Sequence, residues 1–547
     1  MIKKCNSPHK AEYVFSVVSD RTFIGLIFLI FTHILINYIW LVKDNFPLWF
    51  DYGGYFERSI EMYYASQASL IDFAKAILGA GKYSHAYHPH RFMLPLSSVP
   101  WYYIFGTTAD VAVMSCTVFL AIALFSTYAI ASRLFNRFTG LMAAFILSVS
   151  PGFFTFSRRY APEFAVIGMI AFTAYLFLRS ENFKNRFYSI LFGVSCALSM
   201  LVKESALPFI LGLFVYGIYK SKLFSMFRLG YLQQNKKIFF NAIIALFTFG
   251  IILFFIYWPH REHILDFIFN TAYSSDRRKL RGMVDPYSLK GLLFYCRLTF
   301  WHGLSPLFFI FSVIGAFFCM KERSANRGFF LAWIVVSYIF FCSTQTRCYE
   351  YSLPFLIPLA ILASHGLNYM IKNVRLKVVF LVFFVILGMM KIAICSFPII
   401  TEIPRWAYRI NAISFPGFRD FHPVNEDWRL GEIVDYICDN KNDMNKKDTV
   451  CVEANLKAFS SMTLCYVAMQ KKAKLAFLSG GHYSSPIEFI FSCRFVVVKS
   501  GKHQGGFYRF EQMKELKKLL DENTDFAKLP RTFLVADGSV IEIYKKI

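Results

Sequence analysis

The sequence predicts a polytopic α-helical membrane protein with about eleven transmembrane helices and a small extracytoplasmic α/β domain at its C-terminus. Two observations predict this fold class. The 547 residues are 56% hydrophobic and only 17% charged, and the apolar residues gather in long runs. After residue 400 the runs give way to short alternating segments between polar loops. We therefore expect a transmembrane domain over residues 1–400 and an α/β domain over residues 401–547.

The expected spans follow from the length of each apolar run, because about 20 residues of α-helix cross a bilayer. The run from Phe23 to Val42 is too long for the core of a signal peptide, so we expect it to be retained as the first span. The predicted spans are 22–42, 110–132, 138–156, 163–179, 187–202, 204–220, 238–258, 304–320, 328–343, 351–371 and 378–398.

The charge of the loops predicts the orientation. With a cytoplasmic N-terminus, the cytoplasmic loops all carry Lys or Arg, as the positive-inside rule requires. An odd number of spans then places the tail outside.

Because membrane orientation accounts for the net charge of +24, we exclude nucleic acid as a partner and expect the lipid bilayer instead. The basic external loop 259–303 favours a positive patch for an anionic substrate over a miscounted span.

The two external regions have distinct patterns. In the first loop, 43–109, apolar residues recur at helical spacing from Ile60 onward, which predicts a helix lying in the membrane interface and ended by Gly79 and Gly81. In the tail we expect strands at 450–453, 475–478, 495–499 and 541–544, and helices near 427–440, 457–471 and 511–522.

The twelve cysteines show no CxxC and no zinc-finger spacing. Four of them lie in the tail, where an extracytoplasmic location permits disulfides of undetermined pairing: Cys438, Cys451, Cys465 and Cys493. The chain contains no Asn-x-Ser/Thr sequon, which favours a bacterial inner membrane with a periplasmic tail.

A reaction at an outer membrane face has to draw on a membrane-resident donor, because nucleotide sugars are not normally supplied there. A sugar on a polyprenyl phosphate fits, and its phosphate leaves without needing a proton. Such a transfer needs one base for the acceptor hydroxyl and cations for the phosphate, rather than the paired carboxylates of a glycosidase. Asp51, just beyond the first span, is the candidate base.

Several cations stand at span ends on the same predicted face, where charge is costly and suggests function. They are Arg91, Arg158, Arg159, Lys203 and Arg347, the last followed by Tyr349. Each charged residue also has a structural alternative. Asp51 could cap the interface helix, Arg158 could form an ion pair with Glu163, Lys203 could pair locally with Glu204, and Arg347 could be a snorkelling anchor.

A metal site is an open alternative for the histidines. Their spacing can bind zinc, although interfacial polar residues would have the same pattern. The candidates are His85, His88 and His90 in the first loop, and His260 and His263 in the basic loop. No cofactor is required by the sequence, and a divalent metal stays the one alternative.

The segment Asp51-x-Gly53-x-Tyr55-x-Glu57 resembles the first-loop motif of polyprenyl-phosphate-sugar-dependent glycosyltransferases with the GT-C fold. These include the aminoarabinose transferases that modify lipopolysaccharide and the protein O-mannosyltransferases. Further similar segments follow in the family's order over about residues 40–400: 134–141, 148–163, 193–203 and 347–358. The sequence departs at Tyr52, where many relatives have Glu, and at Pro95, which stands alone where two prolines are expected.

The resemblance implies a role for each matching residue. Asp51 would be the catalytic base, and Glu163 and Glu57 would be acidic residues on the acceptor side. The lipid phosphate would be contacted by Arg91, Arg158, Arg159, Lys203, Arg347 and Tyr349. The donor would be a polyprenyl-phosphate sugar, and the acceptor an envelope glycolipid, glycan or protein. The competing functions are a flippase for lipid-linked glycans, and an O-antigen polymerase or ligase.

Overall fold

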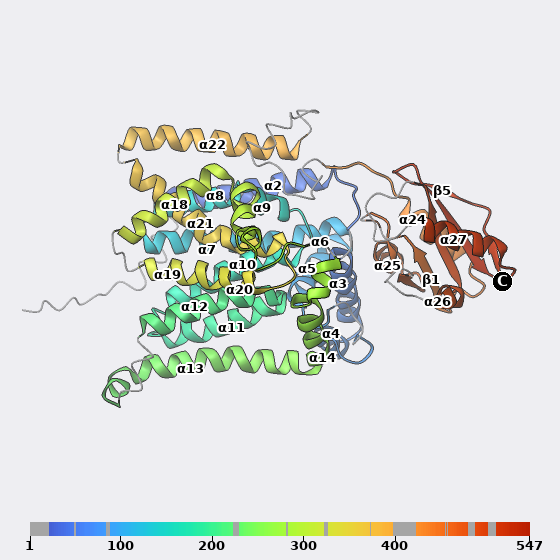
Figure 1. Ribbon diagram of the computed structural model, residues 1–547, viewed down its shortest axis with the longest axis horizontal. Coiled ribbons are helices and arrows are strands. Elements are labelled where there is room, and N and C mark those ends of the chain that lie inside the picture. Colours follow the sequence, from blue (N-terminus) through green and yellow to red (C-terminus); the bar gives the residue numbers. More distant parts are fainter. Residues whose placement is uncertain are drawn as a thin grey trace, which may run out of the picture. The chain divides into compact units, whose positions relative to one another are not determined.

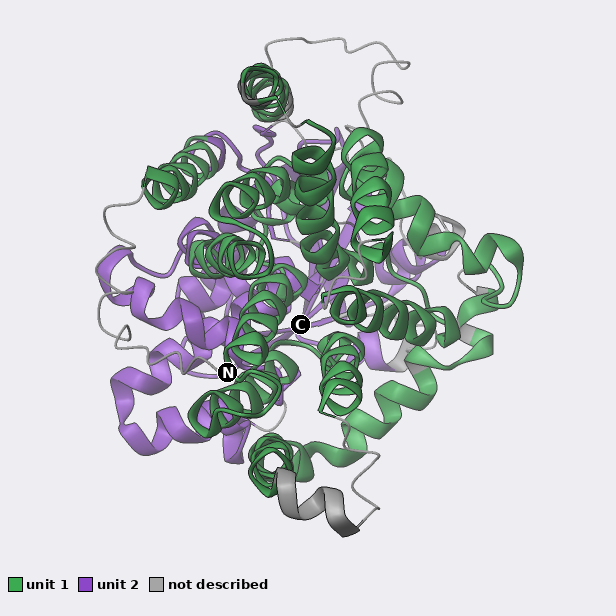
Figure 2. Ribbon diagram, turned by 90° about the vertical axis from the view of Figure 1, so that its left-hand side faces the viewer, with its two compact units in different colours: residues 1–39, 116–422 green, residues 40–115, 423–547 purple. Residues whose placement is uncertain are grey.

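The computed structural model describes residues 21–48, 51–83, 88–221, 229–280, 283–321, 326–371, 373–397, 423–454, 456, 458–479, 487–501 and 510–547. The chain forms two compact units, coloured green and purple in Figure 2. We call residues 1–39 and 116–422 the helical unit, and residues 40–115 and 423–547 the mixed unit. We expected a boundary at residue 400 between two continuous segments. The two units are defined by contacts in space, and each combines two separate segments of the chain.

The helical unit contains the apolar helices (Figure 1). Its longer helices are α2 (Arg21–Leu41), α7 (Thr117–Leu134), α8 (Arg137–Ser148), α10 (Pro162–Arg179), α11 (Arg186–Val202), α12 (Leu207–Lys220), α13 (Leu229–Tyr257), α18 (Pro306–Lys321), α21 (Leu356–Met370) and α22 (Val374–Ser396). Helix α9 (Pro151–Phe156) follows α8 after a break before Pro151, where the proline disfavours helical backbone in the preceding residue.

The remaining elements of this unit are short. They include α14 (Arg261–Phe267), α15 (Ser275–Leu280), α16 (Leu289–Leu292) and α17 (Phe294–Leu298), with π-helical turns η5 (Ile268–Ala272) and η6 (Thr299–Gly303). Helices α19 (Arg327–Leu331) and α20 (Ser337–Ser343) are joined by the π-helical turn η7 (Ala332–Val336), and the 3-10 segment η8 (Tyr349–Phe355) leads into α21. The 3-10 turns η2 (Glu204–Ala206) and η4 (Trp258–His260) precede α12 and α14.

Helices occupy every range in which we expected a span. Among the described residues, five helical segments are long and apolar enough to cross a membrane: Arg21–Leu41, Ala109–Leu134, Pro162–Arg179, Lys236–Asn270 and Tyr349–Met370. Shorter apolar helices accompany them, among them Arg186–Val202 and Pro306–Lys321. The protein is therefore a multi-pass helical membrane protein, and the number of eleven spans stays a prediction.

Close packing in the helical unit depends on small residues, as is common in membrane helix pairs. A Cβ atom on Gly315 of α18 would collide with the carbonyl oxygen of Leu362 in α21, and one on Gly193 of α11 would collide with that of Ala245 in α13. The absent side chains let these backbones touch directly. The helix pairs α18–α21 and α11–α13 are accordingly among the most closely packed in the unit.

In the mixed unit, the first loop forms α3 (Asp51–Ala68), α4 (Leu70–Leu78), the 3-10 turn η1 (Gly81–Tyr83), α5 (Met93–Phe105) and α6 (Ala109–Ser115). The expectation of one helix from Ile60 is corrected in two ways. Helix α3 starts at Asp51, and Ser69 ends it by capping α4, since its hydroxyl accepts the Asp72 N–H at 3.0 Å. Gly79 ends α4 in the left-handed region at φ 61°, as expected.

The tail forms a six-stranded mixed sheet. Its strands are β1 (Asp448–Glu453), β2 (Leu475–Ser479), β3 (Phe495–Ser500), β4 (Phe526–Lys528), β5 (Phe533–Leu534) and β6 (Val540–Lys546). The order is β2-β1-β3-β6-β4, with β5 also paired to β6. Strand β1 is parallel to β2 and β3, whereas β6 is antiparallel to β3, β4 and β5.

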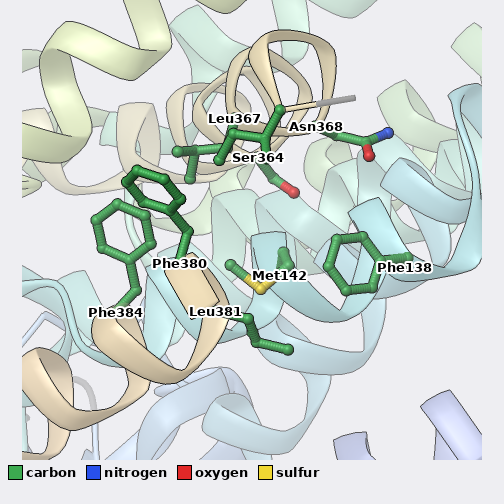
Figure 3. A pocket seen from close by; sticks show the side chains of 9 residues that line it. Phe138, Met142, Ser364, Leu367, Asn368, Phe380, Leu381 and Phe384 are labelled. Atoms are coloured by element: carbon green, nitrogen blue, oxygen red, sulfur yellow. The ribbon is translucent and has the colours of Figure 1, made fainter. Parts of the chain in front are cut away.

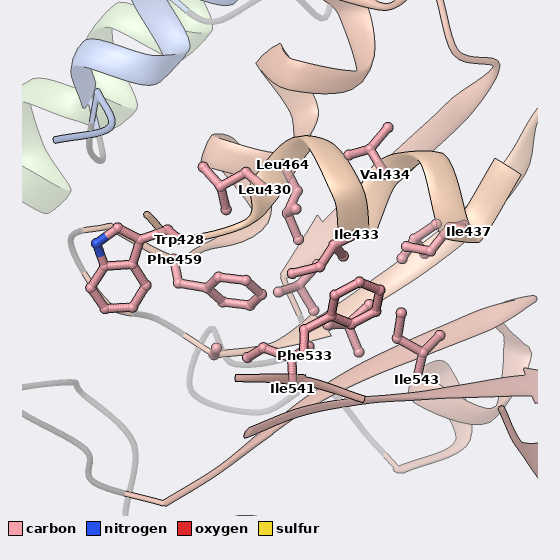
Figure 4. Packing of buried hydrophobic residues seen from close by; sticks show 14 of the residues in the cluster. Trp428, Leu430, Ile433, Val434, Ile437, Phe459, Leu464, Phe533, Ile541 and Ile543 are labelled. Atoms are coloured by element: carbon pink, nitrogen blue, oxygen red, sulfur yellow. The ribbon is translucent and has the colours of Figure 1, made fainter. Parts of the chain in front are cut away.

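Both faces of this sheet are buried, because successive side chains point to opposite sides. Val450 and Val452 face a core that includes Ile433 of α24 (Leu430–Asp439) and Leu464 of α25 (Ser461–Gln470) (Figure 4). The intervening Cys451 faces the second core, with α26 (Ile487–Ser492) and α27 (Phe510–Glu522). The tail is thus a three-layer α/β sandwich.

The predicted tail elements are confirmed, since each expected strand and helix is present within a few residues. The short β4, β5 and α26 were not expected. The four tail cysteines for which disulfides were considered all carry free thiols. Two of them, Cys451 and Cys493, are buried in the same apolar core as small hydrophobic side chains.

Gly315→Ala should destabilise the helical unit, because the added methyl group meets the backbone of α21. We expect a cost of about 1–3 kcal/mol, typical of overpacking, seen as a lower thermal midpoint in detergent. Gly250→Ala is the matched control, since nothing lies within 4 Å of the position that its Cβ would take. Equal midpoints for the two variants would contradict this account of the α18–α21 contact.

Candidate active site

Asp51 is the first residue of α3, and its side chain is exposed. A carboxylate in the first turn of a helix is stabilised by the N–H groups and the dipole at that end. The structure therefore combines the two properties that were alternatives in the sequence: Asp51 begins a helix, and it is accessible to a substrate. This placement leaves the proposed base role as a prediction.

Arg91 reaches the same helix. The side chain is buried, and its Nη1 donates to the hydroxyl of Tyr55 at 3.1 Å. Tyr55 lies four residues after Asp51, so the two share one face of α3. The His88 ring stacks against Tyr55 with centroids 6.2 Å apart. The mixed unit thus brings a buried cation and a histidine to within one turn of the candidate base.

Arg58 is a further cation of α3 and has a structural role. It is fully buried, and its Nη2 donates to the carbonyl oxygens of Ala76 at 2.5 Å and Pro89 at 3.3 Å. Its Nη1 lies 3.7 Å from Glu61. These contacts join α3 to the end of α4 and to the loop that precedes Arg91.

Two carboxyl groups of α3 have raised pKa values. Burial raises the pKa of Glu57, although a hydrogen bond from the Cys465 thiol, at 3.3 Å, and the charge of Lys447 oppose the shift. Burial, and secondarily the negative charge of Glu57, raises the pKa of Glu61 to about 7. Cys465 belongs to α25, so Glu57 joins α3 to the tail within the mixed unit.

The helical unit holds the second group of predicted residues. Lys203, which ends α11, forms an ion pair with Glu163 in the first turn of α10, and both side chains are largely buried. The Lys203 Nζ also lies 5.9 Å from the ring centroid of Tyr351. The predicted local pair with Glu204 is not among the observed ion pairs of the described residues, whereas the long-range pair with Glu163 is.

A small cavity adjoins this ion pair. It encloses about 170 Å³, including its open mouth, and is lined by Glu163, Val166, Ser205, Phe209, Glu350, Tyr351 and Pro354. The Oε2 atom of Glu163 is buried and has no hydrogen-bond partner within the described residues. The cavity is too narrow to hold a water molecule, and its walls include oxygen atoms of two carboxyl groups.

Three predicted phosphate ligands of the helical unit already contact protein groups. Arg158 donates to Asn37 Oδ1 at 3.1 Å and to Ser396 Oγ at 2.5 Å. The guanidinium of Arg159 lies 5.6 Å from the Phe156 ring centroid, and the Tyr349 ring lies 6.1 Å from the same ring. The predicted Arg158–Glu163 pair is not among the described ion pairs, because Glu163 contacts Lys203 instead.

Arg347 forms hydrogen bonds to the segment around residues 286–291. Its guanidinium donates to the carbonyl oxygens of Gly291, Pro286 and Cys342, the last at 2.8 Å. The alternative of a snorkelling anchor does not fit, since the side chain is buried. Arg347 thereby ties the start of η8 to the basic segment 259–303, and its contact with a lipid phosphate stays a prediction.

The histidines are divided between the units. His88 and His90 lie in the mixed unit, His260 and His263 lie in the helical unit, and His85 falls outside the described residues. Within the described ranges, no group of three or more His, Cys, Asp or Glu residues could hold a metal ion. Nothing in this arrangement supports the alternative of a zinc site.

A larger cavity of the helical unit contains none of the predicted site residues. It measures about 300 Å³, including its open mouth, and lies between α8, α21 and α22. Its lining is apolar apart from Ser364 and Asn368 (Figure 3). We assign no chemistry to this cavity, because no charged side chain lines it.

The candidate residues thus form two groups. Asp51, Glu57 and Arg91 lie in the mixed unit, while the helical unit contains Glu163, Lys203, Arg158, Arg159, Arg347 and Tyr349. Their convergence on one site stays a prediction. Glu350 and Glu61 were not predicted as site residues, and Cys465 was not predicted as the partner of Glu57. Glu350 could have been found, since it directly follows Tyr349 at the start of an apolar segment, where a carboxylate is unusual.

Solved structures with a similar fold include ArnT from Cupriavidus metallidurans. Its form bound to undecaprenyl phosphate has a TM-score of 0.57 at 12% identity, and the match covers 98% of both chains. The apo form has a TM-score of 0.58 at 12% identity, over 94% of this chain and 97% of ArnT. The Archaeoglobus fulgidus oligosaccharyltransferase tethered with an acceptor peptide matches with a TM-score of 0.52 at 11% identity, over 87% and 69% of the two chains. The fold is that of the GT-C glycosyltransferases.

Residues 93–258 match the family model described as dolichyl-phosphate-mannose-protein mannosyltransferase. In a comparison with curated protein sequences, no protein matched. The family match over residues 93–258 and the fold agree on a membrane glycosyltransferase with the GT-C fold, which confirms the resemblance seen in the sequence.

Lys203→Met should destabilise the helical unit, because it leaves the Glu163 carboxylate buried without its cation. We expect a loss of about 3–5 kcal/mol in the free energy of unfolding. The double variant Glu163→Gln/Lys203→Met should recover most of this loss, since the charges are removed together. Denaturation of the native protein, Lys203→Met, Glu163→Gln and the double variant in detergent measures the coupling, and additive losses would contradict a direct ion pair.

Glu61→Gln should change how stability depends on pH. The pKa of Glu61 in the folded protein lies above that of the unfolded chain, so its stabilising contribution is complete below about pH 4.5 and is lost as the pH rises through about 7. The thermal midpoint of the native protein should therefore fall more between pH 5 and pH 8 than that of Glu61→Gln. Glu262→Gln, at an exposed position, is the control and should follow the native protein. Parallel curves for all three would refute the assignment.

Proposed function

We propose that this membrane glycosyltransferase moves a monosaccharide from a polyprenyl phosphate to a hydroxyl group of an envelope glycolipid, glycan or protein, with Asp51 as general base. The observation that carries the proposal is an exposed carboxylate at the start of α3, in a chain that shares its fold along nearly its whole length with an undecaprenyl-phosphate-bound protein. The family description, which names a dolichyl-phosphate-linked sugar, supports the same class of donor.

The proposed reaction breaks the bond between the anomeric carbon and the phosphate oxygen and forms a bond to the acceptor oxygen, with inversion. Asp51 takes the acceptor proton as the anomeric carbon gains positive character. The phosphate keeps the bonding electrons and leaves as an anion, so it needs cations rather than an acid. Arg91 is the strongest candidate, because its side chain contacts the helix of Asp51. Lys203 is the second, and it would have to exchange its Glu163 partner for the phosphate.

The other predicted ligands have narrower roles in this proposal. Arg158 and Arg347 stabilise the surrounding loops through the hydrogen bonds described above. Arg159 and Tyr349, which contact the same Phe156 ring, are further phosphate ligands in this proposal. Glu163 and Glu57 form the acidic, acceptor side.

We also propose eleven spans, a cytoplasmic N-terminus and a periplasmic tail in a bacterial inner membrane.

Asp51→Asn should bind the lipid normally and lose turnover, since the amide cannot accept the acceptor proton. The full-length protein in nanodiscs is incubated with a panel of undecaprenyl-phosphate hexoses, pentoses and aminopentoses and a bacterial envelope extract. Release of undecaprenyl phosphate, measured by mass spectrometry, reports transfer whatever the acceptor. We expect a loss of roughly 10²–10⁴-fold, the usual contribution of a general base.

Asp72→Asn is the matched control, because Asp72 is an acidic residue of the neighbouring α4 with no part in the proposed reaction. Undecaprenyl phosphate should bind both variants with the native affinity. Turnover of Asp51→Asn within a few-fold of the native rate would eliminate the base role while leaving the glycosyltransferase class intact.

A further inference from the structure

The tail contacts the helix that begins with Asp51, through α25. Contacts between the two helices follow the same order along both: Gly53 faces Met462 and Tyr466, Phe56 packs on Tyr466, and Tyr64 lies beneath Lys472. Helices α3 and α25 therefore run in the same direction, with their N-terminal ends side by side. All of these residues belong to the mixed unit.

Tyr466 makes the central contact and is only 4% exposed. Its ring meets Phe56 edge to face, with centroids 5.2 Å apart and planes at 69°. A Cβ atom on Gly53 would lie 3.5 Å from the ring, an ordinary van der Waals distance, so the ring packs directly against this turn of α3. The hydroxyl group lies within hydrogen-bonding reach of the Leu48 backbone. One tail side chain thus contacts the chain on both sides of position 51.

Neighbouring contacts extend this attachment along α3 and to the turn between α5 and α6. The Cys465 thiol donates to Glu57 at 3.3 Å, and the Gln470 amide donates to the carbonyl oxygen of Thr107 at 2.8 Å. The N-terminus of α25 is stabilised by a capping box, in which Ser460 and Thr463 form reciprocal hydrogen bonds. The tail therefore offers a rigid support at the point where α3 begins.

The first residue of a helix needs such a support. Its N–H lacks an intrahelical partner, and helix ends fray unless other contacts hold them. A general base must also be held to within about half an ångström of its productive position, because a misplacement of about 1 Å can cost 10²-fold in rate. Asp51 is exposed, so its own side chain has little packing to hold it.

We propose that Tyr466 is a positioning residue that fixes the first turn of α3 and thereby the carboxylate of Asp51. The C-terminal domain is then part of the catalytic apparatus, although none of its residues touches the reacting atoms. The inference rests on the proposed function only in naming Asp51 as the base. The attachment of the turn to Tyr466 can be tested without any substrate.

The first experiment is hydrogen exchange of the full-length protein in nanodiscs, with peptides that cover residues 51–60. Tyr466→Phe keeps the ring and loses the hydroxyl, and Tyr466→Ala loses both. We expect exchange about fivefold faster for Phe, as the loss of one hydrogen bond predicts, and faster still for Ala. Tyr544→Phe is the matched control. Tyr544 is a buried tyrosine of the tail, and its hydroxyl donates to Asp521 at 2.7 Å. In the Tyr544→Phe variant, residues 51–60 should exchange at the native rate.

The second experiment measures kcat and KM with the undecaprenyl-phosphate sugar that the panel identifies. Tyr466→Phe should lower kcat by about 10- to 100-fold with KM within twofold of native, whereas Tyr544→Phe should change neither. A purely structural role would instead lower the amount of active protein equally in both variants. If Tyr466→Ala fails to fold, the Phe variant carries both measurements.

The outcomes separate the two proposals. Unchanged exchange in 51–60 for Tyr466→Phe overturns the positioning role, whatever happens to Asp51→Asn. Faster exchange with full activity in Asp51→Asn leaves the attachment standing and removes the base. Faster exchange with an unaltered kcat in Tyr466→Phe, while Asp51→Asn is inactive, also overturns the inference, because the turn would then be free to move without cost to turnover.

Discussion

Pairing of buried charge is the constraint on which this structure depends. In a chain so rich in apolar residues, an ionised group that leaves water has to find an opposite charge or several hydrogen bonds. Lys203 forms an ion pair with Glu163, which lies forty residues earlier in the sequence. Arg347 donates hydrogen bonds to three carbonyl oxygens, and Arg58 donates to the carbonyl oxygen of Ala76 near the end of α4. Each of these contacts joins segments that are distant in sequence, so the charged residues act as the links between helices whose apolar surfaces have little specificity.

Asp51 differs from these residues because it is exposed at the start of its helix. An exposed side chain is not fixed by a packed core, so its position depends on the helix that carries it. Two contacts hold the helix that carries Asp51. Arg91 donates to Tyr55, one turn along α3, and Tyr466 of the tail packs against Phe56 of the same helix. The same division of labour appears in the helical unit, where the Glu163–Lys203 pair borders a cavity that also exposes Glu350.

Prediction succeeded where one local pattern was sufficient. The long apolar runs, the alternating tail strands and the stop at Gly79 were all recognisable, because hydrophobic period and glycine conformation act over a few residues. It failed where two patterns overlapped. The helix was expected from Ile60, where the apolar periodicity begins, yet α3 already starts at Asp51 and includes Gly53 and Gly54. The short strands β4 and β5 have too few residues to show alternation.

The sequence by itself determined that this is a helical membrane protein with an α/β tail, and it pointed to Asp51 through a motif read along the chain. Only the tertiary structure decided that the first loop joins the tail, that Lys203 pairs with the distant Glu163, and that Arg347 is engaged by backbone carbonyls. The physical reason is the range of the forces. Burial preference and backbone conformation are properties of each residue and its neighbours, whereas the partner of a buried charge or ring is chosen by packing among segments that the sequence does not order in space.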